Sequence, residues 1–528
     1  MGYKKIVALA ILFFVVTAGS ALALARFPQN SPDEASTLFF ITTYARTGAL
    51  RVTEPMNAAV GDLLHPRAVA IVDHDIAPGG FLGLPVLYGA IARAIGVWVI
   101  PIITPLLSAL ALLCFFDVCR RVFSGRIAWW ATVIVMVHPA WIVYTIRGLF
   151  PNVALCAFVI MGAWMFVCAS SMRSRGWWHA CLWIAGGAAM GTALALRPTA
   201  AGWVGASMLF WALAVHVPWK RAVYALCGAA FPLALLLFFQ ARVYGSLFAT
   251  GYASSASDTL VPQAFTHTSS LLLSFLSALF APFGMHIAAL VTHGYLYLLF
   301  FFRWMSLPLA RGVFEWMRER QETARIRRLY AFWYSGMSCM LLVYYGSWSL
   351  SDSTIAGPTL GTSFVRYWLP IYVFGAPFVG WVGVRWYDAI RRKRVFLAYC
   401  AVLFFLVWSG TFAYAVTDES ILSIARTVRT EAKVRSSVLA ATESRAVVLT
   451  DQTDKTLFPA RRVIVFDPMD EAAILRALPI LVAEVPVYYL TQHPETAVIF
   501  LNRYRLASTA YTFKKQQTIA DYTLYAFQ

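Results

Sequence analysis

Two adjacent carboxylates follow the first apolar run of the sequence. Asp33 and Glu34 stand in "SPDEASTLFF", shortly after the apolar segment at residues 6–25. A carboxylate beside a membrane surface can act as a general base that removes a proton from an acceptor hydroxyl or amine. The same letters also fit the start of a helix, because Ser31, Pro32 and Glu34 match a capping box with proline in the first turn. On this pattern alone both explanations stay open.

The polar residues that follow could bind a metal ion or a substrate. "VDHDIAPGG" contains Asp73, His74 and Asp75, whose oxygen and imidazole groups suit a divalent cation. Aspartate and histidine before Pro-Gly are equally typical of turns. A divalent metal is therefore one hypothesis for this segment, and no other cofactor is predicted. His65 and Arg67 precede the segment and could contact a donor or an acceptor.

Arginines near the ends of apolar segments are candidates for binding a phosphate group. Arg366 comes first, because it stands beside aromatic residues just before an apolar segment, and Arg242 and Arg147 follow. A guanidinium group binds phosphate oxygens through paired hydrogen bonds. The alternative is snorkelling, which places arginine and aromatic side chains at membrane edges without any chemistry.

Membrane helices must position these residues. Of the 528 residues, 60% are hydrophobic and 13% are charged, and the mean hydropathy is +0.66. This composition indicates a polytopic membrane protein rather than a soluble one. The first apolar segment also fits a cleavable signal peptide, because it has a charged start and a small-residue end; we expect it to be retained, because the apolar run is long enough to span the membrane. About eleven segments are long enough to span a bilayer. They lie at residues 6–25, 99–118, 127–146, 152–171, 178–196, 199–215, 222–239, 284–303, 329–346, 368–385 and 395–416.

Membrane topology explains the net charge of +18. With a cytoplasmic amino terminus, the basic residues gather in alternate, inward-facing loops. We therefore expect membrane lipids with anionic headgroups, and no nucleic acid, as partners of these loops. The basic residues concerned are Lys4 and Lys5; Arg120, Arg121 and Arg126; Arg173 and Arg175; Lys220 and Arg221; seven arginines between 303 and 328; and Arg385 with "RRKR" at 391–394.

The chain divides into a membrane module at residues 1–416 and a small α/β domain at residues 417–528. Within the module, a loop at 26–98 faces the extracytoplasmic side and contains juxtamembrane helices at 32–47 and near 85–99. The α/β domain lies on the same side. Apolar periodicity in it predicts helices near 418–442 and 470–483, and strands at 446–450, 462–466, 485–490 and 496–501.

Five local motifs, in the same order, resemble those of the GT-C glycosyltransferases, polytopic enzymes that use lipid-phosphate sugars. That superfamily includes protein O-mannosyltransferases and the aminoarabinose transferases that modify lipid A. One position departs from the pattern: Asn152 stands where such enzymes often carry an acidic residue, and asparagine cannot carry a negative charge. The motifs are "PDEA" with "ARTG", "APGGFLGLPVLYGAIARAIG" at 77–96, "CRRVFSGRIAWWA" at 119–131, "VYGSLFATGYA" at 243–253 and "RYWLPIY" at 366–372.

The resemblance implies a mainly α fold: a GT-C transmembrane helical bundle with a small extracytoplasmic α/β domain. It implies a glycosyltransferase that moves a hexose or pentose, with inversion, from a polyprenyl-phosphate donor to a lipid, glycan or protein acceptor. The expected location is the plasma membrane of a bacterium or archaeon. The implied roles are general base for Asp33 with Glu34 beside it, donor-phosphate binding for Arg366, Arg242 and Arg147, and substrate binding for His65, Arg67, Tyr244, Tyr252 and Tyr367.

Three alternatives remain at this stage. A polytopic transporter of lipid or small solute would also have many spans, but it would place ionisable groups near the bilayer midplane. Here the carboxylates concentrate in outward loops, which argues against ion coupling. A non-catalytic membrane scaffold and a ligase that moves whole lipid-linked glycans are the other two.

Overall fold

The computed structural model describes residues 3–172, 176–254, 286–321, 324–347, 359–361, 363–391, 395–466, 472–507 and 509–528. The contacts divide the chain into two compact units. We call the first the helical unit; it comprises Met1–Leu22, Pro101–Leu236 and Leu260–Ser423. We call the second the mixed unit; it comprises Ala23–Ile100, Leu237–Thr259 and Ile424–Gln528. The loop predicted at 26–98 therefore groups with the C-terminal segment.

The helical unit consists of long apolar helices. Helical structure occupies most of the described part of each predicted apolar segment. Of the arginine-containing loops, Arg173 and Arg175 and residues 392–394 lie outside the described residues. The elements are α1 (Tyr3–Leu24), α5 (Ile100–Val122), α6 (Gly125–Val137), α7 (Pro139–Ile146), α8 (Pro151–Ser171), α9 (Trp177–Leu196), η2 (Pro198–Ala200), α10 (Ala201–Ala214), α11 (Trp219–Tyr244), α14 (Ile287–Gly294), η4 (Tyr295–Phe300), α15 (Arg303–Arg318), α16 (Arg325–Gly346), α17 (Ser363–Tyr367), α18 (Leu369–Arg391), α19 (Val395–Thr411) and η6 (Phe412–Val416).

The protein is a multi-pass membrane protein by the length and composition of these helices. Among the described residues, five helices are long and apolar enough to cross a membrane, or seven if each of two bent pairs forms one span. Four of the eleven predicted segments, those of α10, α16, α18 and α19, fall outside this number; α10 and α19 have only 14 and 17 residues. One bent pair is α6 with α7, which meet at 55° where Pro139 begins α7.

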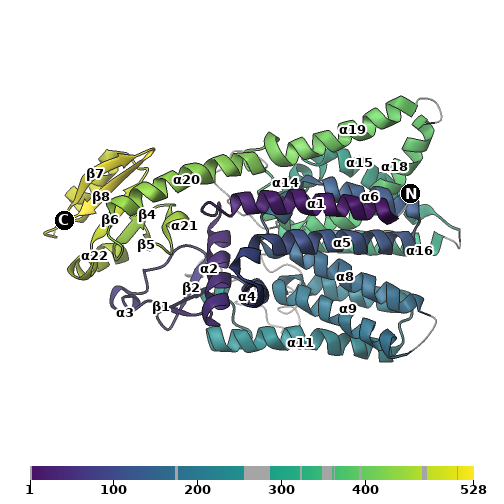
Figure 1. Ribbon diagram of the computed structural model, residues 1–528, viewed down its shortest axis with the longest axis horizontal. Coiled ribbons are helices and arrows are strands. Elements are labelled where there is room, and N and C mark those ends of the chain that lie inside the picture. Colours follow the sequence, from purple (N-terminus) through teal and green to yellow (C-terminus); the bar gives the residue numbers. More distant parts are fainter. Residues whose placement is uncertain are drawn as a thin grey trace. The chain divides into compact units, whose positions relative to one another are not determined.

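Small residues let three helices of this unit approach closely. Helices α8 and α9 lie side by side (Figure 1), and α9 also packs on α11. A Cβ atom at Gly187 would lie 1.9 Å from the backbone oxygen of Ala225, and one at Gly228 would lie 1.9 Å from that of Ile184. Only glycine fits at these two positions, as in other closely packed membrane helices. This packing holds the ends of α8 and α9, where part of the candidate site lies.

The mixed unit combines juxtamembrane helices with two sheets. Its three-stranded sheet has the order β1-β3-β2 and is antiparallel. Helix α11 ends in this unit and α20 begins just before it. The elements are α2 (Pro32–Thr47), β1 (Val52–Thr53), α3 (Asn57–Val60), β2 (Val69–Val72), β3 (Asp75–Pro78), α4 (Gly83–Ile95), η1 (Val97–Val99), α12 (Gly251–Ser254), α20 (Ile421–Ala441), β4 (Val447–Thr450), α21 (Asp454–Leu457), β5 (Arg462–Val465), α22 (Ala472–Glu484), β6 (Val487–Thr491), α23 (Glu495–Phe500), η7 (Leu501–Arg505), β7 (Phe513–Ile519) and β8 (Tyr522–Phe527).

The larger sheet has the order β5-β4-β6-β8-β7 and carries a helix on each face. Strand β4 is parallel to β5 and β6, whereas β8 is antiparallel to β6 and β7. Alternate residues of β4 point to opposite faces: Val447 and Leu449 pack with α22, and Val448 packs with α20. Figure 1 shows α20 and α22 on opposite sides of the strands. The small α/β fold predicted for the tail is confirmed.

One predicted strand in this domain is wrong. Residues 496–501 form most of α23 and the start of η7 rather than a strand. Pro494 precedes the helix and Glu495 lies in its first turn, where both residue types favour a helix start. The place beside β6 in the sheet belongs to β8, which the sequence pattern did not predict.

The predicted helix at residues 32–47 has the bounds of α2. Pro32 begins it, and Gly48 ends it in the left-handed conformation with a φ of 76°, which glycine adopts without strain. Phe40 and Ile41 are buried on its inner face. Helix α4 crosses α2 closely, because Gly89 leaves room for Tyr44: a Cβ at this glycine would lie 2.7 Å from the tyrosine ring.

Candidate active site

The carboxylate pair lies in the first turn of α2. Asp33 is exposed, whereas Glu34 is only 3% exposed. The partial positive charge at a helix N-terminus favours ionised carboxylates in this turn. The predicted capping box is not formed as expected, because the Ser31 hydroxyl makes no capping hydrogen bond to the helix. An exposed carboxylate at this place can meet an acceptor from solvent, whereas the buried Glu34 is suited to a supporting role.

The candidate metal residues form a tight hairpin turn. Asp73 and His74 have φ angles of 51° and 69° and join β2 to β3, as the two central residues of a type I′ turn do. Arg51 Nη2 donates to Asp73 Oδ2 at 2.8 Å, and His74 Nδ1 lies 2.8 Å from Asp62 Oδ1. Among the described residues, no group of three or more His, Cys, Asp or Glu side chains could hold a metal ion. We therefore assign no metal ligands among the described residues.

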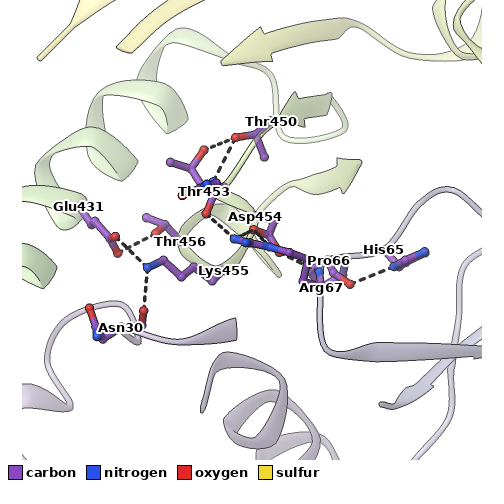
Figure 2. A network of polar contacts seen from close by, with 11 residues as sticks. Asn30, His65, Pro66, Arg67, Glu431, Thr450, Thr453, Asp454, Lys455 and Thr456 are labelled. Carbon is purple, nitrogen blue, oxygen red and sulfur yellow. Dashed lines mark hydrogen bonds and ion pairs between the residues drawn. The ribbon is translucent and has the colours of Figure 1, made fainter. Parts of the chain in front are cut away.

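Arg67 is engaged by a buried carboxylate of the C-terminal segment. Its Nε and Nη2 donate to Asp454 Oδ1 at 3.0 and 2.6 Å, and its backbone N–H donates to Oδ2 at 2.8 Å (Figure 2). The Asp454 side chain is fully buried, while that of Arg67 is 37% exposed. His65 Nδ1 lies 2.9 Å from the carbonyl oxygen of Pro66. These contacts give Arg67 a structural partner that sequence reasoning missed, because 387 positions separate the two residues.

The motif tyrosines of the mixed unit take different positions. The Tyr244 hydroxyl donates to the carbonyl oxygen of Pro78 at 2.6 Å, which links α11 to the end of β3. Tyr252 is 57% exposed, and its ring lies 5.0 Å from that of Phe81. Arg242 is exposed near the end of α11. Tyr252 and Arg242 can therefore reach a ligand, whereas the Tyr244 hydroxyl is already hydrogen-bonded to Pro78.

Two of the candidate arginines converge in the helical unit. Arg147 follows α7, and Arg366 lies in α17. Their guanidinium carbons lie 4.9 and 4.4 Å from the centre of the same ring, that of Phe150. Arg147 is only 6% exposed and Phe150 5%. Residues 219 positions apart in the sequence thus bring two positive charges to one aromatic ring.

A third arginine, Arg197, joins this cluster. It follows α9, and its guanidinium carbon lies 4.2 Å from the ring centre of Tyr367 and 5.3 Å from that of Tyr345. The Arg366 guanidinium also faces Tyr367, at 5.2 Å. Sequence reasoning did not place Arg197 among the phosphate-binding candidates. Its position after an apolar segment, like that of Arg147, was the available signal.

Asn152 supports the backbone of this arginine cluster. Its Nδ2 donates to the carbonyl oxygen of Arg366 at 3.0 Å, so the first turn of α8 holds α17 in place. Its Oδ1 is buried and accepts no hydrogen bond from the residues that the structure describes. An aspartate here could not donate the hydrogen bond when ionised and would add a negative charge beside the guanidinium groups.

The arginine cluster, defined as Arg147, Arg197 and Arg366, has the character of an anion site. Guanidinium groups close together repel one another, and a bound anion relieves that repulsion. Arginine forks match the geometry of phosphate oxygens, and stacking on aromatic rings orients the forks. The cluster can bind a phosphate or a diphosphate, in either case as a monoester or as a diester.

Comparison with solved structures identifies the architecture. ArnT from Cupriavidus metallidurans in the apo state is 13% identical and matches 99% of this chain and 97% of its own, with a TM-score of 0.57. The structure of that protein bound to undecaprenyl phosphate has a TM-score of 0.53 at the same identity and coverage. The Archaeoglobus fulgidus oligosaccharyltransferase in complex with Zn and sulfate, also 13% identical, has a TM-score of 0.53 and is matched over 73% of its length and 99% of this chain.

The chain has the GT-C fold. The fold class expected from the motifs is thereby confirmed, and the match extends over the C-terminal segment as well as the membrane helices. No family model and no curated protein matches this sequence. At 13% identity the likeness is one of fold, so the roles of residues in this chain must be argued from its own side chains.

Proposed function

We propose that this protein is a membrane glycosyltransferase that uses a polyprenyl-phosphate sugar as its donor. The observation that carries the proposal is the arginine cluster, in which the ends of α7 and α9 and the short helix α17 bring guanidinium groups onto shared aromatic rings. Such a cluster suits the phosphate of a lipid-linked donor, and the apolar helices around it suit the polyprenyl chain. The undecaprenyl phosphate bound to ArnT, which shares the fold, supports this donor class.

In the proposed reaction, Asp33 acts as the general base. The acceptor oxygen or nitrogen forms a bond to the anomeric carbon of the sugar, and the bond from that carbon to the phosphate oxygen breaks. The electron pair stays on the phosphate, which leaves as polyprenyl phosphate and is stabilised by Arg147, Arg197 and Arg366. The acceptor proton goes to the Asp33 carboxylate. A single displacement of this kind inverts the configuration at the anomeric carbon.

Glu34 has a supporting role in this proposal. Its burial next to Asp33 in the sequence suits a residue that orients the base rather than one that meets the acceptor. Glu34→Gln keeps the size and a hydrogen-bond acceptor, so it should reduce transfer less than Asp33→Asn does. Among the substrate-binding candidates, the exposed Tyr252 and the partly exposed Tyr367 are better placed than Tyr244.

The location follows from the charge pattern. With the amino terminus in the cytoplasm, the charge pattern puts the basic loops on the inner side and the loop at 26–98, which contains Asp33, on the outer side. We propose that transfer takes place on the outer face of the plasma membrane of a bacterium or archaeon, to a lipid, glycan or protein acceptor.

The test is a transfer assay with purified full-length protein. A panel of radiolabelled polyprenyl-phosphate sugars, with a membrane extract as the acceptor source, is compared for wild type, Asp33→Asn and the control Asp521→Asn, an exposed aspartate in the turn between β7 and β8. Loss of general base catalysis should slow transfer by about 10²–10⁴-fold in Asp33→Asn alone. Equal transfer by Asp33→Asn and wild type would overturn the role of Asp33. A wild-type protein that neither transfers any of these sugars nor binds undecaprenyl phosphate would overturn the donor class.

A further inference from the structure

Lys455 of the C-terminal segment connects two parts of the mixed unit. Its Nζ donates to the carbonyl oxygen of Asn30 at 2.7 Å and lies 3.1 Å from Glu431 Oε1 in α20 (Figure 2). The side chains of Lys455 and Glu431 are each only 15% exposed. A lysine in such a place gives up most of its hydration and rotamer freedom, so its two contacts must hold it firmly.

The contact with Asn30 lies at the entry to α2. Asn30 immediately precedes Ser31, the residue that caps α2, and stands three positions before Asp33. A helix N-terminus is usually anchored by the side chain of its cap residue, but the Ser31 hydroxyl makes no such bond. The charged hydrogen bond from Lys455 therefore anchors the chain where the local anchor is missing.

The short helix α21 and the residue that follows it make three further contacts. Phe458, which follows α21, packs against Phe39 of α2, with ring centres 4.6 Å apart. Asp454 holds Arg67 as described above, and the Thr456 hydroxyl donates to Glu431 Oε2 at 3.0 Å. Successive residues of one turn thus contact α2, the loop before β2 and α20.

We propose that Lys455 is a positioning residue for Asp33. By fixing Asn30 it sets the path of the chain into α2 and hence the place of the carboxylate two residues into that helix. The C-terminal α/β domain is then part of the transfer machinery and not a separate appendage. This inference rests on the proposed role of Asp33 as the base.

The first test measures the anchor directly by hydrogen–deuterium exchange of the full-length protein. Lys455→Met should raise exchange about tenfold in peptides that cover residues 28–36, the effect of losing about 1.4 kcal/mol. Lys455→Arg should restore slow exchange, and Lys433→Met, an exposed lysine of α20, should leave it unchanged. The double variant Lys455→Met/Glu431→Gln removes the carboxylate that would be left buried without a cation, and it should behave like Lys455→Met in these peptides. Wild-type exchange in these peptides in both Lys455→Met and Lys455→Met/Glu431→Gln would overturn the proposal.

The second test asks whether the anchor affects the chemistry. In the transfer assay, Lys455→Met should lower kcat about tenfold with the donor KM unchanged, because the base is displaced while the donor site is intact. Lys455→Arg should recover most of kcat. A wild-type kcat in Lys455→Met, in an assay where Asp33→Asn is inactive, would overturn the positioning role and leave the proposed function standing. Equal activity of Asp33→Asn and wild type would overturn the proposed function, and the link from Lys455 to catalysis with it.

Discussion

The pair of Arg67 and Asp454 makes an asymmetric prediction, because the two side chains differ in their access to water. The Asp454 carboxylate is fully buried and accepts hydrogen bonds from the Arg67 guanidinium at 2.6 and 3.0 Å and from the Arg67 backbone. The Arg67 side chain is 37% exposed. Arg67→Met therefore leaves a buried charge with one hydrogen bond from this partner, whereas Asp454→Asn leaves a cation that water can reach.

The expected costs follow from this difference. Breaking a buried ion pair on the side that leaves the other charge stranded costs about 3–5 kcal/mol. Removing the carboxylate charge while keeping an amide of the same shape should cost about 1–2 kcal/mol, because one hydrogen-bond acceptor remains for the guanidinium. Arg67→Met should thus destabilise the contact by at least about 1 kcal/mol more than Asp454→Asn.

Hydrogen–deuterium exchange in the full-length protein measures both costs as free energies of local opening. The informative peptides cover residues 62–72 and 450–458, on the two sides of the contact. The substitutions to compare are Arg67→Met, Asp454→Asn and the double variant, which should cost less than Arg67→Met alone. Equal or greater opening in Asp454→Asn would refute the reasoning. If Arg67→Met lost sugar transfer but kept wild-type protection from hydrogen exchange, Arg67 would instead be assigned to substrate binding.

Three further predictions test other parts of the structure. Arg366→Met should weaken the binding of undecaprenyl phosphate by about 10- to 100-fold, since a hydrogen bond to a charged group contributes about 1.5–3 kcal/mol; a larger loss in Arg242→Met would contradict the arginine cluster. Burial raises the pKa of Asp451 despite hydrogen bonds that lower it, so its contribution to stability is complete below about pH 4 and is lost as the pH rises through the raised pKa. As the pH rises through that pKa, the amides of β4 and β6 should lose protection from hydrogen exchange in the wild type relative to Asp451→Asn. A difference in protection between the two proteins that does not change with pH would contradict this. Gly187→Ala should lower the thermal stability of the detergent-solubilised protein by about 1–3 kcal/mol through its clash with α11, whereas Gly205→Ala, with open space around it, should not; equal melting temperatures would contradict the packing.

Local signals in the sequence determined several features of the fold. Proline, glycine and apolar spacing marked both ends of α2, and apolar runs marked the membrane helices, because these elements depend on residues close together in the chain. The strand predicted at 496–501 failed for the opposite reason. Whether a β-branched run joins a sheet depends on which partner strand is available, and β8 already occupies the edge of β6.

Composition and local patterns were enough to predict a helical membrane protein with a carboxylate pair at the start of a juxtamembrane helix and with arginines at helix ends. The tertiary structure was needed to show which of these residues lie close together. In it, Arg197, Arg147 and Arg366 pack on shared aromatic rings and Arg67 forms an ion pair with Asp454. Lys455 donates a hydrogen bond to Asn30 at the entry to α2. Each of these contacts joins segments far apart in the chain, and the packing of helices and sheets, rather than any local spacing, brings them together.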